Sequence, residues 1–131
     1  MKKDFIIPPV TGVFVAAVLE DNKEFRSRDW NAYIINDRNV PLEKVLIVAR
    51  GYDNNNTTST MRHSIKVLPA KSYAKIEFLY DEILRLENEF LVTYFEYNVM
   101  HEKSFYFAKN SVKETAVENL PVMPLRGVIA E

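Results

Sequence analysis

The sequence predicts an all-β fold, a two-sheet antiparallel sandwich of about seven strands with a short helical crossover near residues 80–87. Apolar residues recur mainly at every second position, which is the period of a strand and not of a helix. These segments are rich in Val, Ile, Phe and Tyr, which fit a pleated surface, and short polar turns separate them. The 131 residues are expected to form a single domain, with residues 110–131 as a C-terminal extension.

The first expected strand, 10–20, is apolar on both faces. Both of its faces must therefore be covered, and the strand is expected in the centre of a sheet or at an interface. The second expected strand, 30–36, ends at a run of turn-forming Asn and Asp residues, and the third, 42–50, follows Pro41.

The fourth expected strand, 57–68, has one polar face, and the fifth, 73–79, alternates as sandwich strands do. At 80–87 the apolar spacing becomes helical, which predicts one or two helical turns between the sheets. Two aromatic strands, 89–97 and 103–109, complete the sandwich, and residues 112–119 are a second candidate helix.

Composition excludes several classes of protein. The chain has no Cys, which excludes disulfide scaffolds, thiolate catalysis and Cys-containing zinc sites, and its 3 Gly leave little for phosphate-binding loops. A net charge of -1 gives no field that favours nucleic acid or an anionic membrane. Asp4, Pro8 and Pro9 interrupt the resemblance of the N-terminus to a secretory leader, and the apolar run after them is too short to span a bilayer. We therefore expect a cytoplasmic protein.

No catalytic, cofactor or metal site is expected. His63 and His101 are the only imidazoles, and nothing in their spacing brings them together, so His63 is interpreted as a hydrogen-bonded core residue. The polar run 53–57 lacks the acidic pattern of a calcium-binding loop and is typical of a hairpin turn. Ser64 points to the strand face opposite His63, so the two form no catalytic dyad. We expect the protein not to be an enzyme.

Basic and aromatic residues would suit single-stranded nucleic acid if they shared one surface. Acidic residues are interleaved with them, so a solvated sheet face is the preferred interpretation. The basic and aromatic residues in question are Arg26, Arg28, Arg50, Arg62, Lys66, Lys75, Tyr73 and Tyr94.

The strongest signal is apolar, because strand 89–97 carries large side chains on both faces and one sandwich core can cover only one of them. The segment 120–125 either covers the second face within its own chain or inserts into a partner. We predict a homodimer whose contact includes Tyr and Phe anchors. The candidate interface residues are Phe90, Tyr94, Phe95, Tyr97, Tyr106, Met123 and Leu125.

The passage NAYIINDRNVPLEKVLIVARGYD, followed by LPAKSYAKIEFL, resembles a recurring part of immunoglobulin-like sandwich domains. It is also similar to a small uncharacterised bacterial family whose members are sometimes labelled phenylalanyl-tRNA synthetase alpha subunit. The resemblance implies an immunoglobulin-like sandwich and, through that label, a link to translation. The class II synthetase motifs do not map onto the chain, so the resemblance assigns no site residue.

Three hypotheses of function follow. The first is a noncatalytic protein-interaction or assembly module, homodimeric and with an unidentified protein partner. The second is an RNA-associated accessory domain linked to translation, and the third is a sandwich that binds a small molecule.

Overall fold

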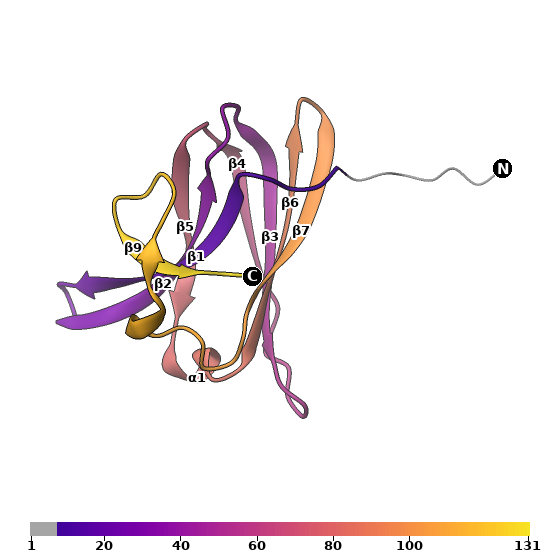
Figure 1. Ribbon diagram of the computed structural model, residues 1–131. Helices are drawn as coiled ribbons and strands as arrows, with labels where there is room; N and C mark the ends of the chain where they lie inside the picture. Colours follow the sequence, from indigo (N-terminus) through magenta and orange to yellow (C-terminus); the bar gives the residue numbers. More distant parts are fainter. Residues whose placement is uncertain (1–7) are drawn as a thin grey trace.

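The computed structural model describes residues 8–131 and confirms an all-β sandwich of two antiparallel sheets (Figure 1). The five-stranded sheet has the order β5 (Ser72–Leu79), β2 (Ser27–Asn36), β1 (Val13–Asn22), β9 (Arg126–Ile129), β8 (Glu118–Asn119). The four-stranded sheet has the order β4 (Met61–Leu68), β3 (Leu42–Tyr52), β6 (Glu87–Glu96), β7 (Val99–Phe107). The expectation that rests on Asp4 lies outside the described residues.

The seven expected strands are present, with ends that differ by a few residues. The crossover helix is α1 (Asp81–Leu84), shorter than 80–87. The second candidate helix, 112–119, is wrong, because only Glu114–Ala116 forms a single 3-10 turn. The extension instead supplies β8 and β9, which complete the five-stranded sheet.

The main core lies between the two sheets. Alternate residues of each strand enter it, so that Val15 and Ala17 of β1 belong to the same apolar cluster as Phe90 and Val92 of β6. The largest fully buried side chains include Tyr94, Phe90 and Phe105. Burying one such ring contributes roughly 1.5–3 kcal/mol, so the aromatic strands supply a large share of the stability.

A second apolar cluster lies on the outer face of β1 and β2. Ala16, Val18 and Ile35 are fully buried there beneath Leu120 and Met123. Both faces of β1 are therefore covered and the strand is third of five in its sheet, which confirms the central position expected from its pattern.

The C-terminal extension, residues 110–131, is called the tail below. It reaches this position because β9 runs close against β1. A Cβ on Gly127 would lie 2.5 Å from the carbonyl oxygen of Ala17, so a side chain larger than hydrogen cannot fit there. The last residue then crosses to the other sheet, where the backbone N–H groups of Glu131 and Tyr106 each donate to the other's carbonyl oxygen at 2.9 and 2.8 Å. The tail thus joins the two sheets on the β7 side.

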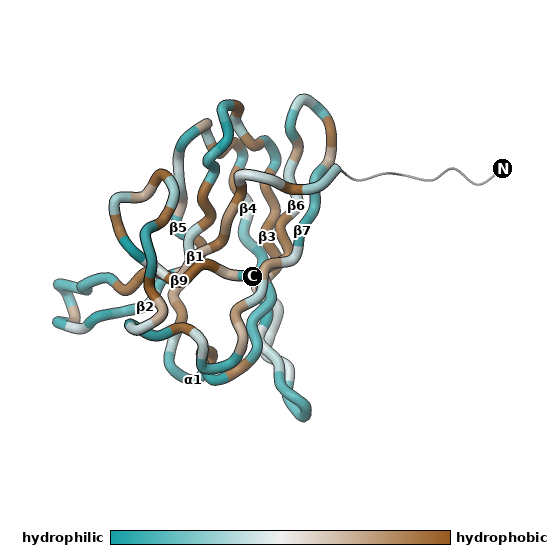
Figure 2. Tube along the Cα trace, in the orientation of Figure 1, coloured by the Kyte–Doolittle hydropathy of each residue, from teal (hydrophilic) through white to brown (hydrophobic). Residues whose placement is uncertain are grey.

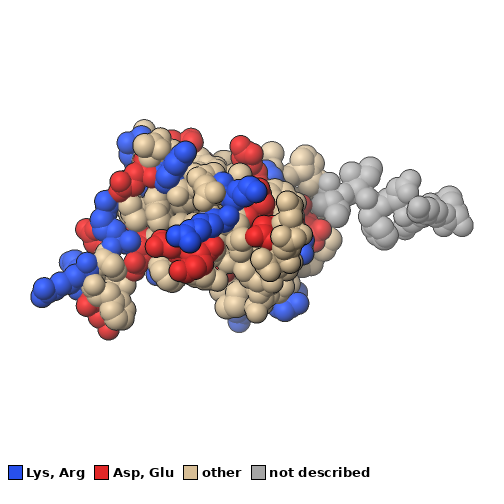
Figure 3. All heavy atoms as spheres, turned by 90° about the horizontal axis from the view of Figure 1, so that it is seen from below, with Lys and Arg blue, Asp and Glu red and all other residues tan. Residues whose placement is uncertain are grey.

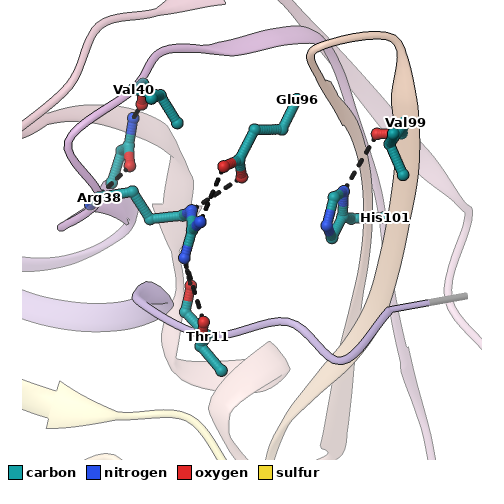
Figure 4. Close-up of polar contacts among 7 residues, drawn as sticks. Thr11, Arg38, Val40, Glu96, Val99 and His101 are labelled. Atoms are coloured by element: carbon teal, nitrogen blue, oxygen red, sulfur yellow. Dashed lines mark hydrogen bonds and ion pairs between the residues drawn. The ribbon is translucent and has the colours of Figure 1, made fainter.

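Two side-chain contacts join other margins of the sandwich. On the β4–β5 side, His63 Nε2 lies 2.7 Å from Glu77 Oε1. Above the core, the Arg38 guanidinium lies between Thr11 and Glu96, as Figure 4 shows. The β1–β2 hairpin and the β3–β4 loop project beyond these contacts, and their tips are mostly hydrophilic (Figure 2).

Candidate interaction surface

The outer face of the four-stranded sheet carries apolar side chains in neighbouring rows. The antiparallel register aligns Val48 with Leu91 and places Phe95 beside Met100, so these pairs share a face. Leu46 and Met100 are 39% and 40% exposed, and the other three are half-buried. We call Leu46, Val48, Leu91, Phe95 and Met100 the outer patch.

The two sheets differ in what covers their outer faces. On the five-stranded sheet, Leu120 and Met123 bury Val18 and Ile35 completely. Among the residues described, no comparable apolar cluster forms over the outer patch. The segment 120–125 therefore covers its own chain, but it covers β1 and β2 and not the aromatic strand whose second face it was expected to reach.

Polar groups frame the outer patch. Arg50 donates to Glu89 at 3.0 Å, and the hydroxyls of Ser104 and Tyr106 donate to the same carboxylate at 3.0 and 3.1 Å. Burial alone would raise the pKa of Glu89, but these three hydrogen bonds outweigh it, and the pKa lies below its ordinary value. Glu89 is therefore a fixed anion at this margin of the patch.

The patch also has a cationic neighbour. The ammonium of Lys44 lies 5.8 Å from the centre of the Phe95 ring, where the negative face of the ring attracts it. Thr93 Oγ1 donates to Glu102 at 3.2 Å on the same face. Apolar side chains at the centre and charged groups at the margin are the usual composition of a protein contact surface.

The seven candidate interface residues divide into two groups. Phe90 and Tyr94 point into the core, and Met123 is packed against β1 and β2 in the second apolar cluster. Each of the three is at most 5% exposed, so they cannot contact a partner. The sequence could not separate the core face of the strand from its outer face, because both are apolar. The four that reach the surface are Phe95, Tyr97, Tyr106 and Leu125.

The burial of Tyr94 leads to a testable pH dependence. Burial raises the pKa of Tyr94 to about 12, with the charge of Glu96 raising it and that of Arg38 lowering it. Because an unfolded tyrosine loses its proton near pH 10, the folded state holds this proton more tightly. The contribution of protonated Tyr94 to the free energy of unfolding is complete below about pH 10. It is lost as the pH rises through about 12, a loss of roughly 2–3 kcal/mol.

We expect Tyr94→Phe to lose less stability than the parent between pH 8 and about pH 12, measured by urea unfolding at both pH values. Tyr97→Phe is the matched control, because Tyr97 is 74% exposed, and it should follow the parent. Equal losses of unfolding free energy in the parent and in Tyr94→Phe would contradict a raised pKa of Tyr94 in the folded state.

The two histidines occupy separate places. His63 is half-buried and contacts Glu77, whereas His101 stacks on Tyr94 with ring centres 5.0 Å apart. No group of three His, Asp or Glu side chains that could hold a metal ion occurs in the part of the chain that the structure describes. In the β3–β4 loop, Asp53 accepts backbone N–H groups of Asn55 and Asn56 at 2.8 Å each, which lowers its pKa and uses its carboxylate to shape the turn.

A cavity of about 400 Å³ lies near the β4–β5 margin. Its lining includes Met61, Phe78, Tyr80 and Ile83, and its charged members already have partners: Arg50 contacts Glu89, and Glu77 contacts His63. This arrangement offers apolar contact but no assembled set of nucleophile and base.

The basic and aromatic residues named above do not form one surface. Tyr94 is buried in the core, so its ring cannot stack on a base. Arg28 lies 2.6 Å from Glu114, and Arg50 is held by Glu89. Figure 3 shows acidic side chains beside basic ones across the lower end of the molecule.

Comparisons with family models, curated proteins and solved structures find no match to this chain. No helix in residues 8–131 is both long enough and apolar enough to cross a bilayer.

Proposed function

We propose that the protein is a noncatalytic interaction and assembly module that acts as a homodimer, with the outer patch as the contact. The observation that carries this proposal is the contrast between the two outer faces. The chain buries the apolar face of β1 and β2 with its own tail, and the described chain places no comparable cover over the outer patch. Apolar patches of this kind mark contact sites.

A second copy suits this surface because most soluble oligomers are symmetric dimers in which one face contacts itself. Two sheets stack about 10 Å apart with interdigitating side chains, which would bury both copies of the patch at once. Leu91 lies in the row of Val48 and Phe95 in the row nearest the β6–β7 hairpin, and both point outward on β6. They are the expected anchors, since a few large side chains carry most of the binding energy at such contacts.

The experiment is a light-scattering measurement of the full-length chain and of Leu91→Lys at tens of micromolar. We expect the parent to scatter with twice the 15.3 kDa mass of one chain and Leu91→Lys to scatter as a monomer. Placing an ammonium at the centre of the contact should weaken dimerisation roughly 30-fold or more.

Phe78→Lys is the matched control, because Phe78 is 50% exposed on β5 of the other sheet. This variant should remain dimeric. A parent chain that scatters as a monomer at the same concentration would refute the proposal, and circular dichroism of each variant excludes unfolding as the cause of a lower mass.

A further inference from the structure

The charges on the outer face of the four-stranded sheet are divided by sign across its width. In this sheet the outward-pointing residues of neighbouring strands lie side by side in rows. These rows show which charged residues share the outer face. The half formed by β3 and β4 carries four cations and one carboxylate: Lys44, Arg50, Arg62, Lys66 and Glu43. The half formed by β6 and β7 carries three carboxylates: Glu87, Glu89 and Glu102.

This division continues to the outermost strands. Arg62 on β4 lies in the row of Val48, Leu91 and Ser104, and it is exposed. Glu102 on β7 lies in the next row, opposite Thr93, and is also exposed. The apolar outer patch therefore lies between a basic margin and an acidic one.

Two faces of this kind can stack around a two-fold axis in two simple ways. If the axis runs across the strands, each strand faces the same strand of the second copy. The two basic margins then face each other, and so do the two acidic margins. If the axis runs parallel to the strands, the two halves exchange, and β4 of each copy lies over β7 of the other. Like charges placed opposite each other across a contact repel, so the charge pattern selects between the two arrangements.

The geometry points to a homodimer whose two-fold axis runs parallel to the strands between β3 and β6, with Arg62 of each copy diagonally across from Glu102 of the other, one row along the strands. This inference rests on the proposed function, because it specifies how the same face meets a second copy. The apolar centre supplies the binding energy, and the divided charges fix the orientation of the two sheets.

Site-specific cross-linking tests the orientation, because the chain has no Cys and each introduced Cys is unique. Ser64 on β4 and Ser104 on β7 are uncharged outward positions in adjacent rows at opposite margins of the face. In the proposed dimer, Ser64 of one copy lies near Ser104 of the other. The two Ser64 residues lie about three strand spacings apart, roughly 14 Å across the face in addition to the separation of the sheets.

The measurement uses a short bismaleimide on Ser64→Cys alone, on Ser104→Cys alone and on an exchanged mixture of the two. We expect at least tenfold more cross-linked product in the mixture than in either variant alone. Efficient cross-linking of Ser64→Cys with itself, in a sample that scatters as a dimer, would overturn the parallel axis and leave the dimer intact. A monomeric sample would instead refute the dimer itself.

A charge exchange provides an independent readout. Glu102→Arg should weaken dimerisation about tenfold, because it places a cation one row away from Arg62 of the second copy. Adding Arg62→Glu to the same chain should restore affinity, since it re-forms the opposite-charge pair in reversed order. Failure of the double variant to recover would contradict the predicted contact between these two margins.

Discussion

A chain that ends at Asn110 is expected to lose its cooperative unfolding transition and to bind hydrophobic dyes. The removed residues include all of β9 and the two side chains, Leu120 and Met123, that cover the outer face of β1 and β2. The truncated protein should keep part of its β circular dichroism while losing sharp tertiary structure, as molten states do.

The physical reason is the amount of buried surface that depends on the tail. Val18 and Ile35 are fully buried beneath it, and Val128 belongs to the main core. Re-exposing one such side chain costs roughly 1.5–3 kcal/mol, so several together approach the 5–15 kcal/mol that typically separates the folded and unfolded states. The loss of β9 also leaves β1 with an unpaired edge, since the two strands pair directly.

Two point variants distinguish the loss of apolar cover over β1 and β2 from the shortening of the chain. Met123 is 5% exposed and Leu125 is 43% exposed, although both lie in the same loop. Met123→Asp should destabilise the fold by about 3 kcal/mol or more in urea unfolding, and Leu125→Asp by less than about 1 kcal/mol. A chain 1–110 that unfolds cooperatively as a monomer would contradict the structural role assigned to the tail.

The strands were predictable because their signal is local. In β6, one face packs in the core and the other forms the outer patch, and alternation alone separates Phe90 and Val92 from Leu91 and Phe95. The same alternation correctly indicated that β1 must be covered on both faces. Period-2 patterns therefore define the two faces of a strand without any knowledge of the neighbouring strands.

The position of the tail was not predictable, because pairing across more than 100 residues leaves no periodic trace. Ala17 pairs with Val128, and the sequence offered two apolar faces that the tail could have covered. Gly127 was the one local signal. An isolated glycine in a strand often marks a close backbone approach, and here it permits β9 to pass against Ala17.

The candidate interface was half predictable for the same reason. The sequence identified the aromatic strands as the place where surface remains to be covered, but it gave Phe90 and Tyr94 the same status as Phe95. Only the packing of the second sheet determines which face becomes core. The ion pair between Arg38 and Glu96 was missed altogether, because 58 residues separate the partners and Arg38 had only the appearance of a turn residue.

That ion pair is expected to be the most costly single interaction to break. Arg38 Nε and Nη2 each donate to a different carboxylate oxygen of Glu96 at 2.7 Å, and this contact raises the pKa of Arg38 despite its desolvation. The side chains are only 32% and 10% exposed. Arg38→Met would leave the Glu96 carboxylate in a largely buried place without its counter-ion.

We expect Arg38→Met to lower the free energy of unfolding by about 3 kcal/mol, measured in urea at one protein concentration. The double variant Arg38→Met/Glu96→Met should recover most of that loss, because it removes the stranded charge together with its partner. Lys71→Met is the matched control from an exposed pair with Asp37 at 2.8 Å, and it should cost less than about 1 kcal/mol. If Arg38→Met lowers the free energy of unfolding no more than Lys71→Met does, the bidentate Arg38–Glu96 ion pair contributes no more than a surface ion pair. The hydrogen bonds of the 36–40 turn must then hold the two sheets together at that end of the sandwich.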